Sequence, residues 1–246
     1  MKNLIIFVVL LLSNSFGYAQ LLEENAWNTY EGSIGNTKCQ LSIYFFSNRN
    51  IKGNYIFKNS NKEISVSGYL KGNAIFLTDI DHPKYSFKAN IFSNTQDKIE
   101  GVYIDSLQNK ELLLNLHLES ICWSSYPNHY TDINGTKDEI EDFACKVKKA
   151  IVDNNKEWIA GNIRYPFNWV LKSGYSTIHN KLQLIKYYDQ VFTVNFKQKI
   201  KEDYTTNLFN KDGEVMLGNG EIWIGNPSRP TDKNKFIIAS INPVVN

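Results

Sequence analysis

The sequence predicts a two-part fold, an antiparallel all-β, barrel-like meander followed by an α+β domain with helices on one side of a curved antiparallel sheet. Apolar residues alternate with polar ones from about residue 27 to 121, as in strands with one buried face. A polar stretch with Pro and Gly follows, and beyond it apolar residues recur at helical spacing before strands return. We therefore divide the 246 residues into a signal peptide 1–19, an all-β domain 20–123, a linker 124–135 and an α+β domain 136–246.

The first nineteen residues have the pattern of a cleaved secretory signal peptide. Lys2 precedes an apolar run from Leu4 to Leu12, and the small residues Gly17 and Ala19 have the spacing that a signal peptidase recognises. The run is far shorter than the ~20 residues of a membrane-spanning helix, although an uncleaved anchor is the alternative interpretation. We expect an exported protein, periplasmic or extracellular, with no membrane span in the mature chain.

The charge balance argues against two classes of partner. The chain has 27 Lys and Arg against 25 Asp and Glu, a net charge of +2, and cleavage after Ala19 removes Lys2 and leaves +1. A nearly neutral protein has no electrostatic basis for a broad nucleic-acid or anionic-membrane role. We expect no nucleic-acid partner.

Hairpin-like strands fill the first half. The alternation is clearest in four stretches, Leu41–Phe45, Ile51–Phe57, Tyr85–Ile91 and Leu112–Leu118. Short turn-type segments separate them, and roughly eight strands at this spacing favour closure, which removes exposed sheet edges. Glycine in a strand often marks a bend, so the four strand glycines suit a small coiled barrel, the alternative being scattered turn glycines. They are Gly32, Gly53, Gly68 and Gly101.

Helices open the second half. Thr136 and Glu139 have capping-box spacing, and an apolar face at helical spacing follows them. A short helix over Lys156–Ala160 should end at Gly161, and Asn180 should cap a further helix, whose face continues through Phe196 and Ile200. Predicted strands are Ile163–Val170, Tyr204–Phe209, Glu214–Ile224 and Phe236–Ile241, with an Asp212-Gly213 hairpin turn.

Three cysteines allow more than one arrangement. Export permits a disulfide, either Cys39 with Cys122 or Cys122 with Cys145, and leaves one thiol over. The alternative is three buried, reduced thiols that act as small apolar residues.

Residues 138–242 resemble the nuclear transport factor-like, or cystatin-like, α+β cone domains of exported bacterial proteins. The segments that carry the resemblance are Ile163–Phe167, Tyr187–Phe192 and Gly213–Ile224. The first half resembles small lipocalin-like all-β domains. The resemblance implies a curved sheet wrapped on helices with an open cone mouth, which some relatives use for enolisation or dehydration and many use for binding alone.

Catalysis in such a cone needs a base in an apolar cavity, and the candidates are His179, Asp189 and Glu221. We expect Asp189 to be structural instead, accepting bonds from backbone or tyrosine donors near the Tyr187-Tyr188 turn. The second half is rich in aromatic residues, which suit a ligand surface or simply a core. The candidate cone mouth comprises Trp169, His179, Tyr188, Asp189 and Trp223.

No catalytic, phosphate-binding or metal motif stands out, and we assign no catalytic residue, cofactor or metal. The four histidines are scattered, and the lysine run at 146–149 is interpreted as a solvated helix face. We expect an exported, non-enzymatic binding or inhibitor-like protein whose partner is an unknown protein or small ligand. The alternatives are a small-molecule enzyme that uses Asp189 or His179, and a structural component of the cell envelope.

Overall fold

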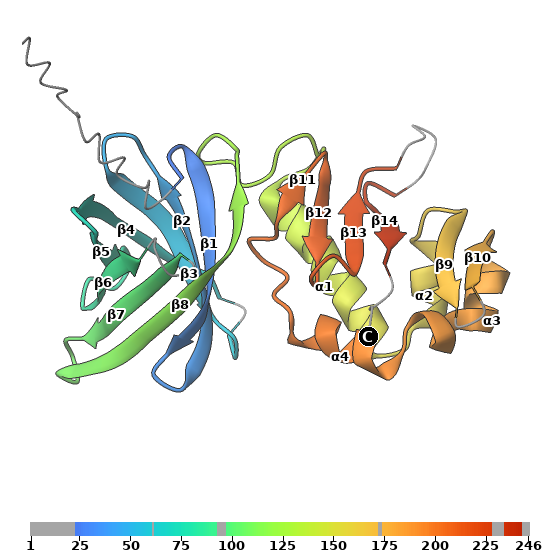
Figure 1. Ribbon diagram of the computed structural model, residues 1–246, viewed down its shortest axis with the longest axis horizontal. Coiled ribbons are helices and arrows are strands. Elements are labelled where there is room, and N and C mark those ends of the chain that lie inside the picture. Colours follow the sequence, from blue (N-terminus) through green and yellow to red (C-terminus); the bar gives the residue numbers. More distant parts are fainter. Residues whose placement is uncertain (1–22, 61, 93–96, 172–173, 228–233, 243–246) are drawn as a thin grey trace, which may run out of the picture.

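The computed structural model describes residues 23–60, 62–92, 97–171, 174–227 and 234–242. A β-barrel and an α+β region lie side by side, with the four-stranded sheet and its helix nearest the barrel (Figure 1). The predicted signal peptide lies outside the described residues. Among those residues, no helix is both long and apolar enough to cross a membrane.

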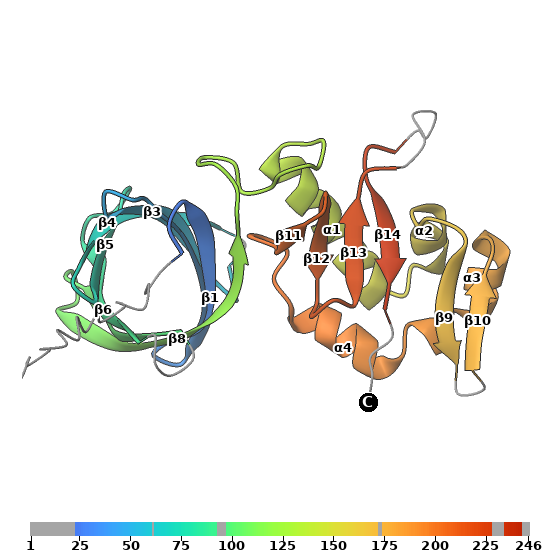
Figure 2. The same cartoon turned by 45° about the horizontal axis from the view of Figure 1, so that its top comes forward.

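The first half forms a closed antiparallel barrel in which each strand pairs with its sequence neighbours and β1 also pairs with β8. Figure 2 looks into this ring of strands. The strands are β1 (Ala26–Ile34), β2 (Thr37–Phe45), β3 (Asn50–Phe57), β4 (Ile64–Lys71), β5 (Ala74–Asp79), β6 (Tyr85–Phe92), β7 (Lys98–Asp105) and β8 (Lys110–Cys122). The predicted eight-stranded meander and its closure are confirmed.

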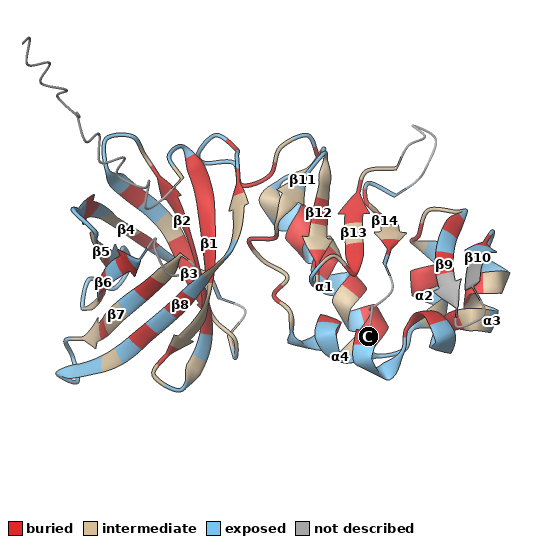
Figure 3. Cartoon of the chain, viewed as in Figure 1, coloured by how far each residue is buried: buried red, intermediate tan, exposed pale blue. Residues whose placement is uncertain are grey.

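Side chains fill the barrel interior. Buried residues alternate with more exposed ones along β6 and the middle of β8, as the sequence pattern requires (Figure 3). The core includes an aromatic group around Tyr55, whose hydroxyl lies 3.2 Å from that of Tyr103. At each of the four predicted strand glycines, an added β-carbon would lie only 1.8–2.3 Å from a carbonyl oxygen of the adjacent strand. Close strand approach therefore requires glycine at these positions.

The described residues of the second half form four helices and two antiparallel sheets, which confirms the α+β class. The helices are α1 (Lys137–Val152), α2 (Lys156–Gly161), α3 (Lys181–Val191) and α4 (Val194–Glu202). One sheet is the hairpin of β9 (Phe167–Leu171) and β10 (Gly174–Ile178). The other has the order β11 (Asn210–Lys211), β12 (Glu214–Leu217), β13 (Ile222–Gly225) and β14 (Ile237–Ile241).

Local sequence signals account for most of these boundaries. The capping box of α1 is present, with the Glu139 amide donating to Thr136 Oγ1 and the Thr136 amide donating to Glu139 Oε2. Asn180 caps α3, and Asp212 and Gly213, both with positive φ, form the turn between β11 and β12. The buried side of α1 packs into one core with the four-stranded sheet and the other helices.

Three predicted strands differ from the structure. Tyr204–Phe209 is not a strand, because this segment bonds to the barrel and to α1 rather than to a sheet. Glu214–Ile224 is divided into β12 and β13 by a turn in which Gly218 and Gly220 have positive φ. The strand expected from Ile163 begins only at Phe167, since Pro166 has no N–H to donate and Ile163 forms an isolated bridge with Ile238.

Neither expected disulfide forms. All three cysteines are free thiols, with Cys39 and Cys122 buried and Cys145 exposed on α1. The expectation of three reduced thiols holds, but Cys145 is not a core residue.

Candidate functional site

The segment 124–135 is part of the contact between the two domains. Trp27 on β1 donates its indole N–H to the Asn128 carbonyl at 2.8 Å. His129 is buried against the rings of Trp27 and Tyr130, and its Nε2 lies 3.3 Å from Ser42 Oγ on β2. Burial lowers the pKa of His129 to about 3, so the ring is neutral. The central residues of the predicted linker 124–135 thus contact the barrel.

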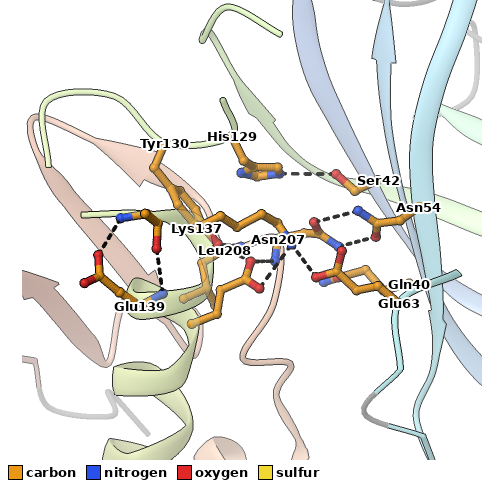
Figure 4. A network of polar contacts seen from close by, with 12 residues as sticks. Gln40, Ser42, Asn54, Glu63, His129, Tyr130, Lys137, Glu139, Asn207 and Leu208 are labelled. Atoms are coloured by element: carbon orange, nitrogen blue, oxygen red, sulfur yellow. Dashed lines mark hydrogen bonds and ion pairs between the residues drawn. The ribbon is translucent and has the colours of Figure 1, made fainter. Parts of the chain in front are cut away.

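Asn207 connects the segment after α4 to the barrel. Its amide Nδ2 donates to Asn54 Oδ1 at 2.8 Å and to Gln40 Oε1 at 3.1 Å (Figure 4). Gln40 in turn donates to Glu31 Oε1 at 3.0 Å. A chain of buried amides thus runs from the α+β domain into β3, β2 and β1, and such networks hold their members in one arrangement when every group is bonded.

Glu141 fixes the same segment from the side of α1. Its Oε1 accepts bonds from the Tyr130 hydroxyl at 2.7 Å and from the Asn207 backbone amide at 2.8 Å. Its Oε2 accepts from Lys137 at 3.1 Å, and Lys137 also pairs with Glu63 in the loop after β3. These four contacts position α1, the β3–β4 loop and the segment after α4 around a common space.

That space is a cavity of about 320 Å³. One wall is the polar face of α1, whose lining positions 138, 141, 142, 145 and 148 form a single stripe at helical spacing. The second wall is the end of β3 with the loop after it, and the third is the segment 203–206. The lining residues are Ile56, Lys58, Ser60, Glu63, Asp138, Glu141, Asp142, Cys145, Lys148, Asp203, Tyr204, Thr205 and Thr206.

Two lysines form one end of the cavity. Lys58 donates to the Glu202 carbonyl and Lys148 to the Asp203 carbonyl, at the carboxyl end of α4. Within the described part of the chain, neither ammonium lies within 4.0 Å of a carboxylate oxygen. Burial, with repulsion from Lys148, lowers the pKa of Lys58 to about 8, and burial also lowers that of Lys148. Each ammonium has three N–H donors, so each retains donors for a ligand.

Tyr204 completes this end. The Lys58 ammonium lies 3.8 Å from the centroid of its ring, a cation–π contact. Tyr204 is 9 % exposed, and among the described residues its hydroxyl has no hydrogen-bond partner. That oxygen has almost no exposed surface, so Tyr204 contributes its ring, rather than a free hydroxyl, to the cavity lining.

A second, smaller cavity of about 30 Å³ lies on the other side of the same segment. Three of its lining residues are carboxylic acids, Glu31, Glu119 and Asp203. Burial raises the pKa of all three, that of Glu31 to about 7. They do not make a metal site: no group of three or more His, Cys, Asp or Glu suited to a metal ion occurs in the described ranges.

The structure places the predicted cone-mouth residues apart from both cavities. Trp169 and Tyr188 are buried in the α+β core, and Trp223 is half-buried against Phe209. His179 is exposed. Asp189 is 71 % exposed and pairs with Lys156 at 2.7 Å and Lys197 at 3.6 Å, chiefly the first of which lowers its pKa. Its partners are lysines rather than the expected backbone or tyrosine donors.

Glu221, the third candidate base, is buried and accepts a bond from Lys199 at 3.0 Å. It lines neither cavity.

Sequence reasoning missed Lys58, Lys148 and Tyr204. Lys148 belongs to the run interpreted as a solvated face, yet it lines the cavity while Lys146 and Lys149 are exposed. One signal was present: residues 138, 141, 142, 145 and 148 form a polar stripe on the helix side opposite its apolar face. That stripe does not reveal that another domain covers it.

No protein family, curated protein or solved structure matches the chain. The resemblance to cone and lipocalin-like domains stays a prediction.

Proposed function

We propose that this is an exported, non-enzymatic binding protein that holds a small polar ligand in the cavity between its two domains. The observation that carries the proposal is the set of unused bonding groups at the lysine end. The ammonium groups of Lys58 and Lys148 line one space and have donors without partners. A cavity of about 320 Å³ is within the ~300–1,000 Å³ range of small-molecule sites, which often lie between domains.

The alternative of an enzyme based on Asp189 or His179 has less support. Both side chains are exposed, and Asp189 is held ionised by two lysines, whereas a general base in a cone needs an apolar cavity. The structural-component alternative rests on no particular contact among the described residues.

The test is thermal unfolding of the mature chain in the presence of alanine tripeptide, glucose, succinate or inorganic phosphate. Each probe is added to about 1 mM, a concentration at which ligands with dissociation constants up to about 1 mM are detected. A ligand that binds only the folded state raises its melting temperature. We expect at least one probe to do so for the wild type and for Lys146→Gln, and not for Lys148→Gln. Lys146 is the matched control, since it is an exposed lysine on the same helix. Failure of every probe, or an equal shift in Lys148→Gln, would contradict the proposal.

A further inference from the structure

The cavity has charges of opposite sign at its two ends. Lys58 and Lys148 form one end, where the single Asp203 carboxylate also interacts with both ammonium groups, and Asp138 and Asp142, both exposed and on the first turns of α1, lie toward the other. Neither aspartate has an ion-pair partner among the described residues, whereas Glu63 and Glu141 share Lys137. The helix dipole favours a negative charge in the amino-terminal turn, which accounts for Asp138. It does not account for Asp142, which lies beyond that turn.

The total charge of the lining opposes a simple anion. Five carboxylates face two ammonium groups, and Lys137 pairs with two of the carboxylates. A ligand with only negative charge would meet Asp138 and Asp142 at a cost, and one with only positive charge would meet the two lysines. A ligand with one charge of each sign is favourable at both ends.

The spacing along α1 sets the length of such a ligand. An α-helix rises 1.5 Å per residue, so the levels of Asp142 and Lys148 are about 9 Å apart and those of Asp138 and Lys148 about 15 Å apart. An extended peptide spans about 3.3–3.6 Å per residue, so two to four residues cover these distances. A single amino acid is too short to reach both ends.

We infer, on the basis of the proposed binding function, that the cavity takes a short free peptide of about two to four residues, the length set by the helix rise. Its carboxylate lies at Lys58 and Lys148, and its ammonium group lies at Asp138 and Asp142. Charge-assisted hydrogen bonds from two ammonium groups are suited to a terminal carboxylate. The polar walls around Ser60, Thr205 and Thr206 offer bonds to the peptide backbone.

Calorimetric titration of the mature chain with three forms of alanine tripeptide tests this inference. The free peptide has both charges, N-acetyl-tripeptide has only the carboxylate, and the tripeptide amide has only the ammonium. A hydrogen bond to a charged group contributes about 1.5–3 kcal/mol, so blocking either end should weaken binding about tenfold or more.

Variants assign the two ends. Lys148→Gln should reduce the penalty for amidation, because the carboxylate has lost one of its two lysine partners, and Asp142→Asn should likewise reduce the penalty for acetylation. Lys146→Gln and Asp81→Asn are the controls, being exposed charges outside the cavity, and should bind as the wild type does. Lys148 donates a hydrogen bond at the carboxyl end of α4, so a thermal melt is used to check that the Lys148→Gln variant still folds. Asp142 is exposed and without partners, which keeps the test valid if Lys148→Gln unfolds.

The outcomes separate the two proposals. If the acetylated peptide binds as tightly as the free one, the occupant is a carboxyl-terminal tail or a simple anion, and the inference of a free peptide is overturned. If no peptide binds but glucose, succinate or phosphate does so through Lys148, the binding function stands and the peptide assignment fails. If none of these probes binds, both fail.

Discussion

Asn207 and Asn54 form a reciprocal amide pair across the domain contact, with Asn207 Nδ2 2.8 Å from Asn54 Oδ1 and Asn54 Nδ2 3.3 Å from Asn207 Oδ1. Both side chains are buried, and the two residues lie 153 positions apart in sequence. The pair therefore connects the barrel and the α+β domain at the point where the cavity-lining segment 203–206 leads into the sheet.

We predict that Asn207→Ala destabilises the chain by about 3 kcal/mol. The change removes the partner of both polar atoms of the buried Asn54 amide and the donor to the Gln40 carbonyl oxygen, and it places alanine at a positive φ of 48°, which asparagine tolerates better. Urea unfolding measures the loss. Asn154→Ala is the matched control: Asn154 has a φ of 56° but is exposed, so its replacement should cost only about 1 kcal/mol of backbone strain. Equal losses at the two sites would show that the amide pair contributes nothing.

Glu31→Gln should change how stability depends on pH. The pKa of Glu31 is raised to about 7 in the folded state, above its unfolded value of 4.5. The folded state therefore binds the proton more tightly, and its extra stability is complete below pH 4.5 and lost as pH rises through 7. The variant lacks this loss, so its stability relative to the wild type should rise by about 3 kcal/mol between those pH limits.

Urea unfolding at several pH values measures the Glu31 effect. His129 titrates in both proteins and cancels in the comparison, although on its own it lowers stability as pH falls below 6.5, where the unfolded ring gains a proton. Glu111→Gln, an exposed glutamate on β8, is the control and should give a curve parallel to the wild type. A parallel curve for Glu31→Gln would contradict the prediction.

Gly68→Ala should destabilise the barrel by about 1–3 kcal/mol or more, because the new β-carbon would lie 1.8 Å from the Phe76 carbonyl oxygen on the paired strand. That atom is backbone and moves only if β4 and β5 separate. Gly161→Ala, at the end of α2, adds a β-carbon with nothing within 4 Å and should be nearly neutral. Thermal melts of both variants decide the point, and similar melting temperatures would disprove it.

Asp189→Asn should leave the melting temperature almost unchanged. Its carboxylate is exposed and its partners are two surface lysines, so the pairs are screened by water and salt. Any small loss should disappear in about 1 M NaCl, where the screening length is only ~3 Å. Glu141→Gln, at a buried acid with three partners, should by contrast reduce stability at all salt concentrations. A large decrease in the melting temperature of Asp189→Asn that does not depend on salt would contradict this prediction and support the structural role expected from the sequence.

The sequence predicts what local pattern determines. The alternation of polar and apolar residues predicts the barrel strands, because each strand has one buried face. The capping box at Thr136 predicts the start of α1, and the Asp212-Gly213 turn predicts the β11–β12 hairpin, because both depend on residues that are close in sequence. Tyr204–Phe209 was mistaken for a strand because its apolar and aromatic residues suit one. Its actual partners, Glu141, Gln40 and Asn54, are 66 to 167 positions away.

The cavity was not predictable for the same reason. Lys58 is at the end of a barrel strand, Lys148 is in a lysine-rich helix and Tyr204 follows a different helix. Each alone has the pattern of an ordinary surface or core residue. Only the docking of the two domains brings them together, and neither hydrophobic period nor spacing encodes that docking.

The three thiols differ enough to make the wild-type chain a ready-made optical sensor. Cys39 and Cys122 are buried, and burial raises the pKa of both, that of Cys122 to about 11, so they react slowly with thiol reagents. Cys145 is exposed and lies on the cavity wall between Asp142 and Lys148. An environment-sensitive dye would thus attach at one position, without mutagenesis, where its emission would report directly on whatever enters.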